Sequence, residues 1–354
     1  MWARIIGILV LGVVVLSACP GGAALGPSKR LSGGRTYTRV YTWAPDQAWA
    51  ASAQDLIVTR DGGQTWTILL TVFRPEQVLD NMGFEGALNG QVWWAGDPGL
   101  RVTTDGGQSW TTWSQQIFYP DGQLATTVDR IRLVTPTEAW GIEEYAPGQD
   151  PPVRGEALRH TRDAGRNWER MPIPKLGLAA LSVMDFGFFS PQVGWVMLGS
   201  GHVFRTRDGG QTWERCGQLY KLLRQVLFVD PETGWALESR YPYPPQIYRT
   251  TDGGQTWALA TLPPLPRDTQ LSQVFFLDAT TGWVAGWSGT ILHTTDGGQT
   301  WQLQPSRTPK DLTAIHFSDP QHGWAVGDQN TILKTADGGQ TWTKVDDDLK
   351  NWRP

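Results

Sequence analysis

Seven aspartates recur along the chain in nearly the same eight-residue setting, T-x-D-G-G-Q-T-W. They are Asp61, Asp105, Asp163, Asp208, Asp252, Asp296 and Asp337. Carboxylates can bind metal ions or act as acids and bases, but both roles need several ligands or partners close together. Each of these aspartates stands alone in its segment and precedes small residues that permit positive φ angles. The pattern therefore predicts aspartates that stabilise turns, and it assigns them no metal, cofactor or catalytic step.

The other reactive side chains form no recognisable catalytic or metal-binding set. The five histidines are scattered without the spacing of metal ligands. The two cysteines, Cys19 and Cys216, exclude a disulfide framework and a CxxC redox motif. The formal net charge of −4 gives no basic patch of the kind that nucleic acid needs. We therefore expect no cofactor and no nucleic-acid partner, and we interpret Cys216 as a structural cysteine.

The first residues have the pattern of a targeting signal and not of a folded domain. Residues 2–18 form an apolar run that is short for a membrane span and ends in Leu16-Ser17-Ala18-Cys19. This end resembles the site where bacterial lipoproteins are acylated. The resemblance predicts a signal peptide over 1–18, lipid attachment at Cys19, a flexible tether over 19–36 and an extracytoplasmic, membrane-anchored location. An uncleaved anchor helix that ends in a cysteine is the alternative.

The seven aspartate segments are the visible part of a longer repeat of about 44 residues. A second tryptophan column comes before each segment, at Trp49, Trp93, Trp140, Trp195, Trp235, Trp283 and Trp324. Between these marks the residues alternate in the β manner, with room for four strands in each unit. The sequence therefore predicts an all-β fold, a seven-bladed β-propeller with four-stranded antiparallel blades and one aspartate segment per blade. It would occupy residues 37–346, with a C-terminal tail over 347–354 and no obvious overlapping strand to close the ring.

The string T-x-D-G-G-Q-T-W resembles the Asp box, which occurs in sialidases, xyloglucan-degrading propellers, sortilin-type receptors and photosystem II assembly factors. The resemblance implies a hairpin turn in which the aspartate accepts backbone N–H groups and the tryptophan inserts between neighbouring sheets. All seven copies fit this motif.

Long insertions point to one face of the propeller. In a four-stranded antiparallel blade, the loop between the second and third strands opens on the same side as the link to the next blade. The longest loops of this kind are residues 145–156 and 238–246, and the links 114–127 and 262–270 are also long. Loops on a rigid scaffold often carry binding residues, although insertions without a role are the alternative. The insertion residues that we select as candidates are Tyr145, Asp150, Arg154, Arg240, Tyr241 and Tyr243. Shorter equivalent loops add Asp97, Trp287, Asp328 and Asn330 around the channel mouth, with a core position as the alternative for Trp287.

Over residues 37–345 the chain is similar to the photosystem II stability and assembly factor family. The similarity lies in the seven boxes and in a recurrent second strand, as in Gly323-Trp324-Ala325-Val326-Gly327. It implies a non-enzymatic scaffold that binds a protein at the membrane. We therefore predict a lipid-anchored docking protein for a membrane-protein segment or an envelope complex. The alternative is a glycan-binding or glycoside-hydrolysing propeller, although the arginine-bearing segment of sialidases is absent and a xyloglucan-type cleft needs two propellers.

Overall fold

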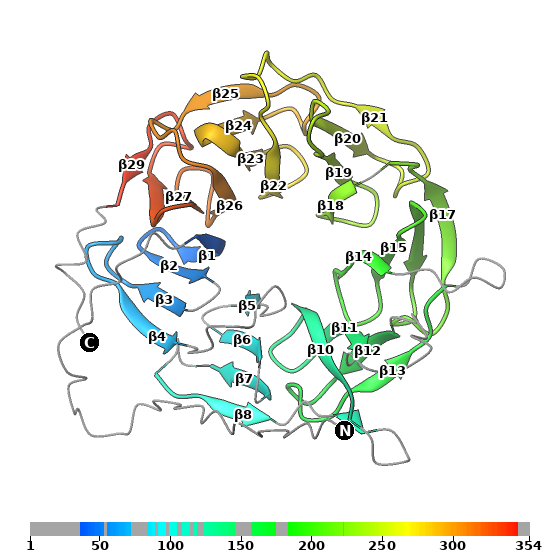
Figure 1. Ribbon diagram of the computed structural model, residues 1–354. Helices are drawn as coiled ribbons and strands as arrows, with labels where there is room; N and C mark the ends of the chain where they lie inside the picture. Colours follow the sequence, from blue (N-terminus) through cyan, green and yellow to red (C-terminus); the bar gives the residue numbers. More distant parts are fainter. Residues whose placement is uncertain are drawn as a thin grey trace, which may run out of the picture.

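The strands form a ring of antiparallel sheets around a central opening (Figure 1). The computed structural model describes residues 36–345, with gaps at 53–54, 72–83, 89–90, 97–98, 105–107, 114–116, 119–123, 146–156, 175–182 and 222. The predicted signal peptide, Cys19, almost all of the predicted tether and the C-terminal tail lie outside the described residues. Within them, no helix has the length and apolar character that crossing a bilayer requires.

The sheets follow the chain, and we number them as blades in that order. Blade 1 contains β1 (Tyr37–Ala44), β2 (Gln47–Ser52), β3 (Asp55–Thr59) and β4 (Thr67–Thr71). Blade 2 contains β5 (Phe84–Leu88), β6 (Gln91–Gly96), β7 (Gly99–Thr103) and β8 (Thr111–Trp113). Blade 3 contains β9 (Ile117–Phe118), β10 (Leu124–Leu133), β11 (Ala139–Tyr145), β12 (Ala157–Thr161) and β13 (Glu169–Met171). Blade 4 contains β14 (Val183–Phe188), β15 (Gly194–Leu198), β16 (His202–Thr206) and β17 (Glu214–Gln218).

The last three blades are the most regular part of the ring. Blade 5 contains β18 (Leu223–Phe228), β19 (Gly234–Glu238), β20 (Gln246–Thr250) and β21 (Ala258–Leu259). Blade 6 contains β22 (Leu271–Phe276), β23 (Gly282–Gly286), the short 3-10 turn η1 (Trp287–Gly289), β24 (Thr290–Thr294) and β25 (Gln302–Pro305). Blade 7 contains β26 (Leu312–Phe317), β27 (Gly323–Gly327), β28 (Thr331–Thr335) and β29 (Thr343–Lys344).

The predicted architecture is confirmed in its main feature, because six of these sheets are four-stranded antiparallel blades. The prediction of four strands was wrong for blade 3, which has five. Its extra strand β9 pairs antiparallel with the inner strand β10, with Phe118 opposite Leu124. The sequence between them contains Pro120-Asp121-Gly122, a string of residues common in turns. The long link into blade 3 therefore adds a strand to the sheet.

Aromatic contacts join consecutive blades from blade 3 to blade 7. Trp235 of blade 5 stacks on Phe276 of blade 6 with ring centroids 3.4 Å apart, and the box tryptophan Trp301 meets the same phenylalanine edge-on at 5.6 Å. Trp283, Phe317 and Trp342 repeat this arrangement between blades 6 and 7. In blades 4 to 7 the strand residue before the second-column tryptophan is glycine, because the first strand of the same blade ends in a phenylalanine: a Cβ atom on Gly282, for example, would lie 2.6 Å from the Phe276 ring. The Gly-Trp pair of these blades therefore makes room for the phenylalanine that packs against the preceding blade.

The Asp boxes form the turns that the sequence predicts. In blade 6 the Thr294 hydroxyl donates to Asp296 Oδ1, and the Thr300 backbone N–H donates to the same carboxylate at 3.0 Å. The Gly298 N–H in turn donates to the Thr294 hydroxyl oxygen, with Gly298 at φ +82°. The same bonds recur at Asp61, Asp163, Asp208, Asp252 and Asp337. Asp105 lies outside the described residues.

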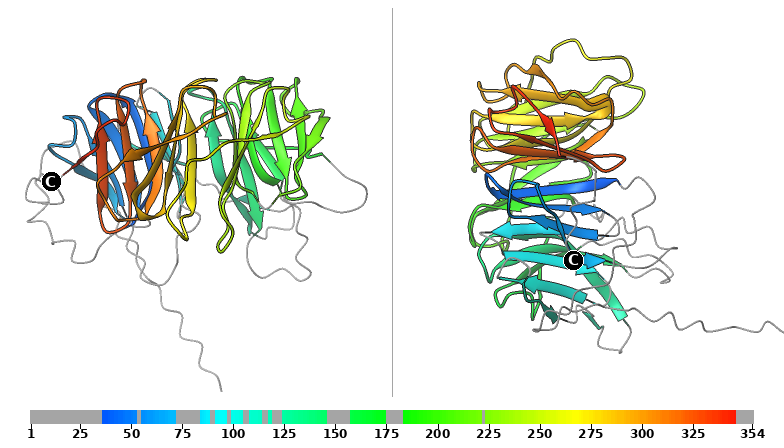
Figure 2. Two further views of the ribbon diagram at one scale, coloured as in Figure 1. Left: turned by 90° about the horizontal axis from the view of Figure 1, so that it is seen from above. Right: turned by 90° about the vertical axis from the view of Figure 1, so that its left-hand side faces the viewer.

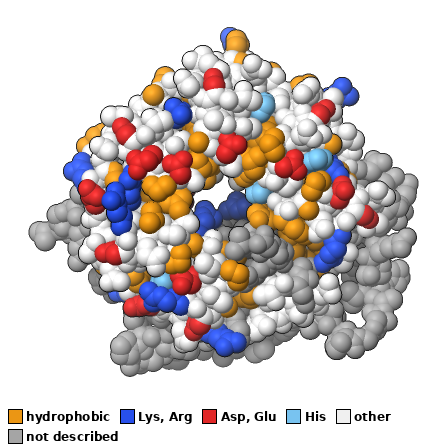
Figure 3. Space-filling view, turned by 180° about the vertical axis from the view of Figure 1, so that it is seen from behind, with side chains coloured by type: hydrophobic (Ala, Val, Ile, Leu, Met, Phe, Trp, Pro, Cys, Tyr) orange, Lys and Arg blue, Asp and Glu red, His pale blue; other side chains and the backbone are white. Residues whose placement is uncertain are grey.

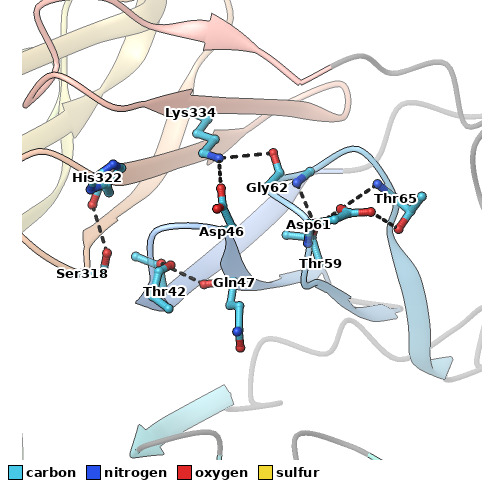
Figure 4. A network of polar contacts seen from close by, with 12 residues as sticks. Thr42, Asp46, Gln47, Thr59, Asp61, Gly62, Thr65, Ser318, His322 and Lys334 are labelled. Atoms are coloured by element: carbon cyan, nitrogen blue, oxygen red, sulfur yellow. Dashed lines mark hydrogen bonds and ion pairs between the residues drawn. The ribbon is translucent and has the colours of Figure 1, made fainter.

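Blades 1 and 7 close the ring without exchanging a strand, because each sheet uses consecutive strands. Lys334 Nζ of blade 7 lies 2.7 Å from Asp46 Oδ1 of blade 1 and also reaches the Gly62 carbonyl (Figure 4). The Thr42 backbone N–H donates to His316 Nδ1, and burial lowers the pKa of His316 to about 3, so this imidazole is neutral at pH 7. Trp66 and Trp324 pack edge-to-face within one shared core. Side-chain contacts therefore close the propeller.

Candidate docking face

The ring has two faces with different turns, because its strands run roughly along the ring axis (Figure 2). We call the side that carries the box turns and the turns between first and second strands the box face. We call the other side the loop face. It carries the loops between second and third strands and the links between blades, and it is the side toward the viewer in Figure 1. Figure 3 shows the box face, where basic and acidic side chains are interspersed around the ring.

The described part of the loop face contains an open pocket of about 340 Å³ between blades 5 and 6. One wall is the β19–β20 loop, which contributes residues 242–245, and the other is the β21–β22 link, which contributes 262–263 and 265–270. Five of the lining residues are prolines. Proline restricts the backbone, so a pocket with these walls keeps its shape and costs a ligand little ordering entropy.

Gln270 fastens the two walls together. Its side-chain Nε2 donates to the Tyr243 carbonyl at 3.0 Å, and its Oε1 accepts from the Ser239 hydroxyl at 3.1 Å. The Ser239 oxygen also accepts the Leu271 backbone N–H at 2.8 Å. Only 5% of Gln270 is exposed, so these bonds are shielded from water. The buried amide therefore makes the loop and the link a single preformed unit.

The pocket is lined by the exposed ring of Tyr243 and a few polar groups, and Tyr241 lies next to its lining in the same loop. Tyr241 and Tyr243 are 58% and 67% exposed, which is unusual for such large rings. The hydroxyl of Thr269 lies buried in the lining and has no hydrogen-bond partner. A buried hydroxyl without a partner costs free energy that a bound ligand can recover. This arrangement suits an extended segment with apolar groups and a polar backbone.

A charged cluster lies at the base of the same blade 5 loop. Lys221 Nζ is 3.5 Å from Glu238 Oε2, and the Tyr248 hydroxyl donates to the same carboxylate at 3.1 Å. Hydrogen bonding to Tyr248, together with the charge of Glu238, raises the pKa of Lys221, so its ammonium group stays protonated at neutral pH. Lys221 therefore presents a fixed positive charge beside the loop.

The structure brings together some of the predicted site residues and separates others. Arg240, Tyr241 and Tyr243 lie in the β19–β20 loop, and Tyr243 lines the pocket. Trp287 is 37% exposed and is therefore not a core residue, and its backbone N–H donates to the Gln270 carbonyl at 2.8 Å. Asp328 and Asn330 lie in the β27–β28 turn of blade 7, where Asp328 accepts the Thr36 hydroxyl at 2.8 Å. They take no part in the pocket.

The remaining predicted site residues cannot be placed in this pocket. Asp97, Asp150 and Arg154 lie outside the described residues. Tyr145 ends β11, and only its backbone is described. Sequence reasoning missed Thr269 and Gln270 as individual residues, although it selected the link that contains them. The sequence feature that could have identified Thr269 and Gln270 is their position as a polar pair between a proline-rich link and an inner strand.

Nothing in the described residues resembles a metal centre, since no group of three or more His, Cys, Asp or Glu residues converges there. The six box aspartates of the described residues are occupied by turn hydrogen bonds, and bonds from Thr212 and Thr206 lower the pKa of Asp208 to about 2. A carboxyl group with a low pKa is a poor general acid at neutral pH. The box aspartates are therefore structural.

Sequence comparisons link the C-terminal part of the chain to one family. Residues 218–308 and 301–352 match the family model for the photosynthesis system II assembly factor YCF48. Over 90 residues the chain is 32% identical to the chloroplastic photosystem II stability/assembly factor HCF136 of Arabidopsis thaliana, covering 24% of this chain and 22% of that protein. Over 89 residues it is 35% identical to the photosystem II assembly lipoprotein Ycf48 of Synechocystis sp., covering 24% and 26%. The matched region spans about a quarter of the length of these curated relatives.

Solved structures share the propeller over most of the chain. A structure of YCF48 bound to a D1 peptide superimposes with a TM-score of 0.62 at 21% identity, covering 88% of this chain and 96% of that one. The GH74 xyloglucanase from Xanthomonas campestris superimposes with a TM-score of 0.61 at 13% identity, covering 89% of this chain and 55% of that one. At these identities the likeness shows the fold alone, so it does not choose between a binding protein and an enzyme.

Proposed function

We propose that this chain belongs to a photosystem II assembly factor-like family of β-propellers and is a non-enzymatic docking protein for a segment of a membrane protein or envelope complex. Lipid attached at Cys19 would hold it on the extracytoplasmic side of a bacterial membrane. The docking site is the pocket between blades 5 and 6, with Tyr241 and Tyr243 as its aromatic anchors. The observation that carries the proposal is the pair of proline-rich walls that Gln270 fastens together beside two exposed tyrosines.

The proposed partner is a protein because the pocket has the features of a peptide site. Tyrosine and arginine are favoured anchors of protein interfaces, and Arg240 is exposed beside Tyr241. Preformed proline walls lower the entropy lost on binding. The relative whose structure contains a D1 peptide supports a protein-binding role for this kind of propeller.

The test is site-specific photocrosslinking in native membranes with the lipidated, full-length protein. A photoreactive phenylalanine analogue replaces Tyr243, and a matched probe replaces Leu303, which is exposed on the outer strand β25. We expect one membrane protein to crosslink from position 243 only, and to be lost when Gln270→Ala is added. Equal crosslinking from both positions, or a product insensitive to Gln270→Ala, would refute the docking site.

The second candidate is a glycan-binding or glycoside-hydrolysing propeller, because the xyloglucanase has the same propeller fold. A glycosidase of either stereochemistry needs two carboxyl groups flanking the scissile bond. The pocket lining contains one acidic residue, Asp268. Hydrolysis of xyloglucan oligosaccharides by the purified protein would favour this candidate over docking.

A further inference from the structure

Exposed aromatic side chains are distributed unequally between the two faces. Among the described residues, four exposed large rings lie on loop-face turns and links: Tyr220, Tyr241, Tyr243 and Trp287. The other exposed large hydrophobic residues are Ile68, Leu259 and Leu303, and they lie on the outer strands β4, β21 and β25. None of the exposed large hydrophobic residues of the described chain lies on a box-face turn. The loop face therefore carries the most exposed aromatic rings of the described residues.

Basic side chains without acidic partners accompany these rings. Arg240, Arg267 and Arg307 are exposed in the loop and links of blades 5 to 7, and none of them forms an ion pair with another described residue. Lys310 is half-buried in the β25–β26 link and is also unpaired. The acidic residues of the same segments are Asp268, Asp311 and Asp328, and they form no ion pair with another described residue. With Lys221 and Glu238 paired to each other, the loop face of these blades therefore carries one more basic than acidic side chain.

The chain enters the propeller on this face. Thr36 precedes the inner strand β1, and its hydroxyl is bonded to Asp328 in the β27–β28 loop-face turn. As the flexible tether that the sequence predicts, the segment between Cys19 and Thr36 would have an end-to-end distance of about 23 Å. Lipid attached at Cys19 would therefore hold the loop face, and not the box face, close to the bilayer.

From these three observations we propose that the loop face of blades 5 to 7 lies against the headgroup region of an anionic bilayer. Tyrosine and tryptophan prefer the membrane–water interface, because one end of the ring is apolar and the other can hydrogen-bond. Arginine and lysine beside them are attracted to negatively charged lipids. The proposal rests on the lipid attachment in the proposed function, and it adds the orientation of the propeller. The docking pocket would then open at the lipid surface, where segments of a membrane protein emerge.

The test measures orientation on vesicles that contain no partner protein. Full-length lipidated protein with Cys216→Ser carries one added cysteine, either Pro264→Cys on the loop face or Gln321→Cys on the box face. Both positions are exposed, and neither side chain makes a hydrogen bond or ion pair in the structure. Each added cysteine is labelled with an environment-sensitive fluorophore. One set of vesicles contains phosphatidylglycerol and the other contains only phosphatidylcholine. Both sets include a nitroxide-labelled lipid that quenches the fluorophore when the two are close. Flotation of the vesicles reports the lipid anchor separately.

We expect strong quenching at position 264 and little at position 321 on anionic vesicles. Each basic residue near an anionic surface changes the population about fivefold. The double variant Arg307→Gln/Lys310→Gln should therefore reduce the membrane-facing population about 25-fold, and its flotation should not change. Equal quenching at the two positions would overturn the proposed orientation. The role of anionic lipid would be overturned if quenching at position 264 were the same on both kinds of vesicle and did not change in the double variant. Protein that fails to float would contradict the lipid anchor, whereas the crosslinking assay tests the docking pocket independently.

Discussion

The clearest test of the docking pocket is the removal of the amide that joins its walls. Gln270→Ala deletes the hydrogen bonds to the Tyr243 carbonyl, the Thr269 carbonyl and the Ser239 hydroxyl. A buried hydrogen bond contributes about 1 kcal/mol net, so the variant should lose about 3 kcal/mol of the free energy of unfolding. The β19–β20 loop would also lose its fixed position. Ordering even one freed residue costs about 1–2 kcal/mol, which weakens partner binding about tenfold or more.

The matched control is Gln225→Ala on the inner strand β18. Its side chain bonds to the backbone N–H and carbonyl of Val274 at 2.8 and 3.0 Å, so it makes similar bonds away from the loop face. Urea denaturation gives the stability of both variants, and the crosslinking yield from position 243 gives partner binding. We expect both variants to lose stability, but only Gln270→Ala to lose the crosslink. Parallel losses of the crosslink in both variants would refute the argument that the walls must be joined.

Three further predictions concern the scaffold. Gly282→Ala should lower the free energy of unfolding by about 2 kcal/mol, and with it the urea midpoint, because the new Cβ atom would collide with the Phe276 ring. Alanine is ordinarily better than glycine in a strand, so an unchanged or raised midpoint would contradict this packing argument. Asp208→Asn should make the stability of the protein less dependent on pH in the acid range, as followed by circular dichroism. Bonds from Thr212 lower the pKa of Asp208 to about 2, so the stabilisation from its carboxylate is present above pH 4 and is lost as the pH falls toward 2. An unaltered acid unfolding profile would count against this. Burial raises the pKa of Cys216, so iodoacetamide at pH 7 should alkylate it more slowly than free cysteine, and equally fast labelling would disprove this.

The regular parts of the fold could be predicted from sequence because they depend on short-range chemistry. Each Asp box closes its own turn through bonds between residues two to four positions apart, as at Thr294 and Asp296. The repeat of about 44 residues then gives the blades. The extra strand β9 was missed because it forms within a link whose length alone does not distinguish a loop from a hairpin.

The contacts that shape the candidate site depend on the tertiary structure. Gln270 reaches Tyr243 across 27 residues, and Lys334 reaches Asp46 across 288. Gln270 belongs to no repeating pattern, so its partners could not be predicted from spacing. Lys334 directly precedes the box threonine, a position at which Arg205 of blade 4 likewise pairs with an acidic residue of the next blade, Glu232, but the sequence reasoning did not use this repeat. The face on which insertions lie could be predicted, because strand direction alternates within a blade, whereas the atoms that fasten those insertions could not.

The contrast between the faces has a physical cause that also explains where binding can evolve. On the box face, each turn is fixed by a carboxylate, a threonine hydroxyl and glycines with positive φ, as at Asp296, Thr294 and Gly298. A change of length there would break several hydrogen bonds and displace the box tryptophan from between two blades. The loops and links of the loop face carry no such motif, so residues can be inserted without disturbing the core. A single added amide such as Gln270 is then enough to make an insertion rigid, and a rigid insertion with exposed rings is a binding surface.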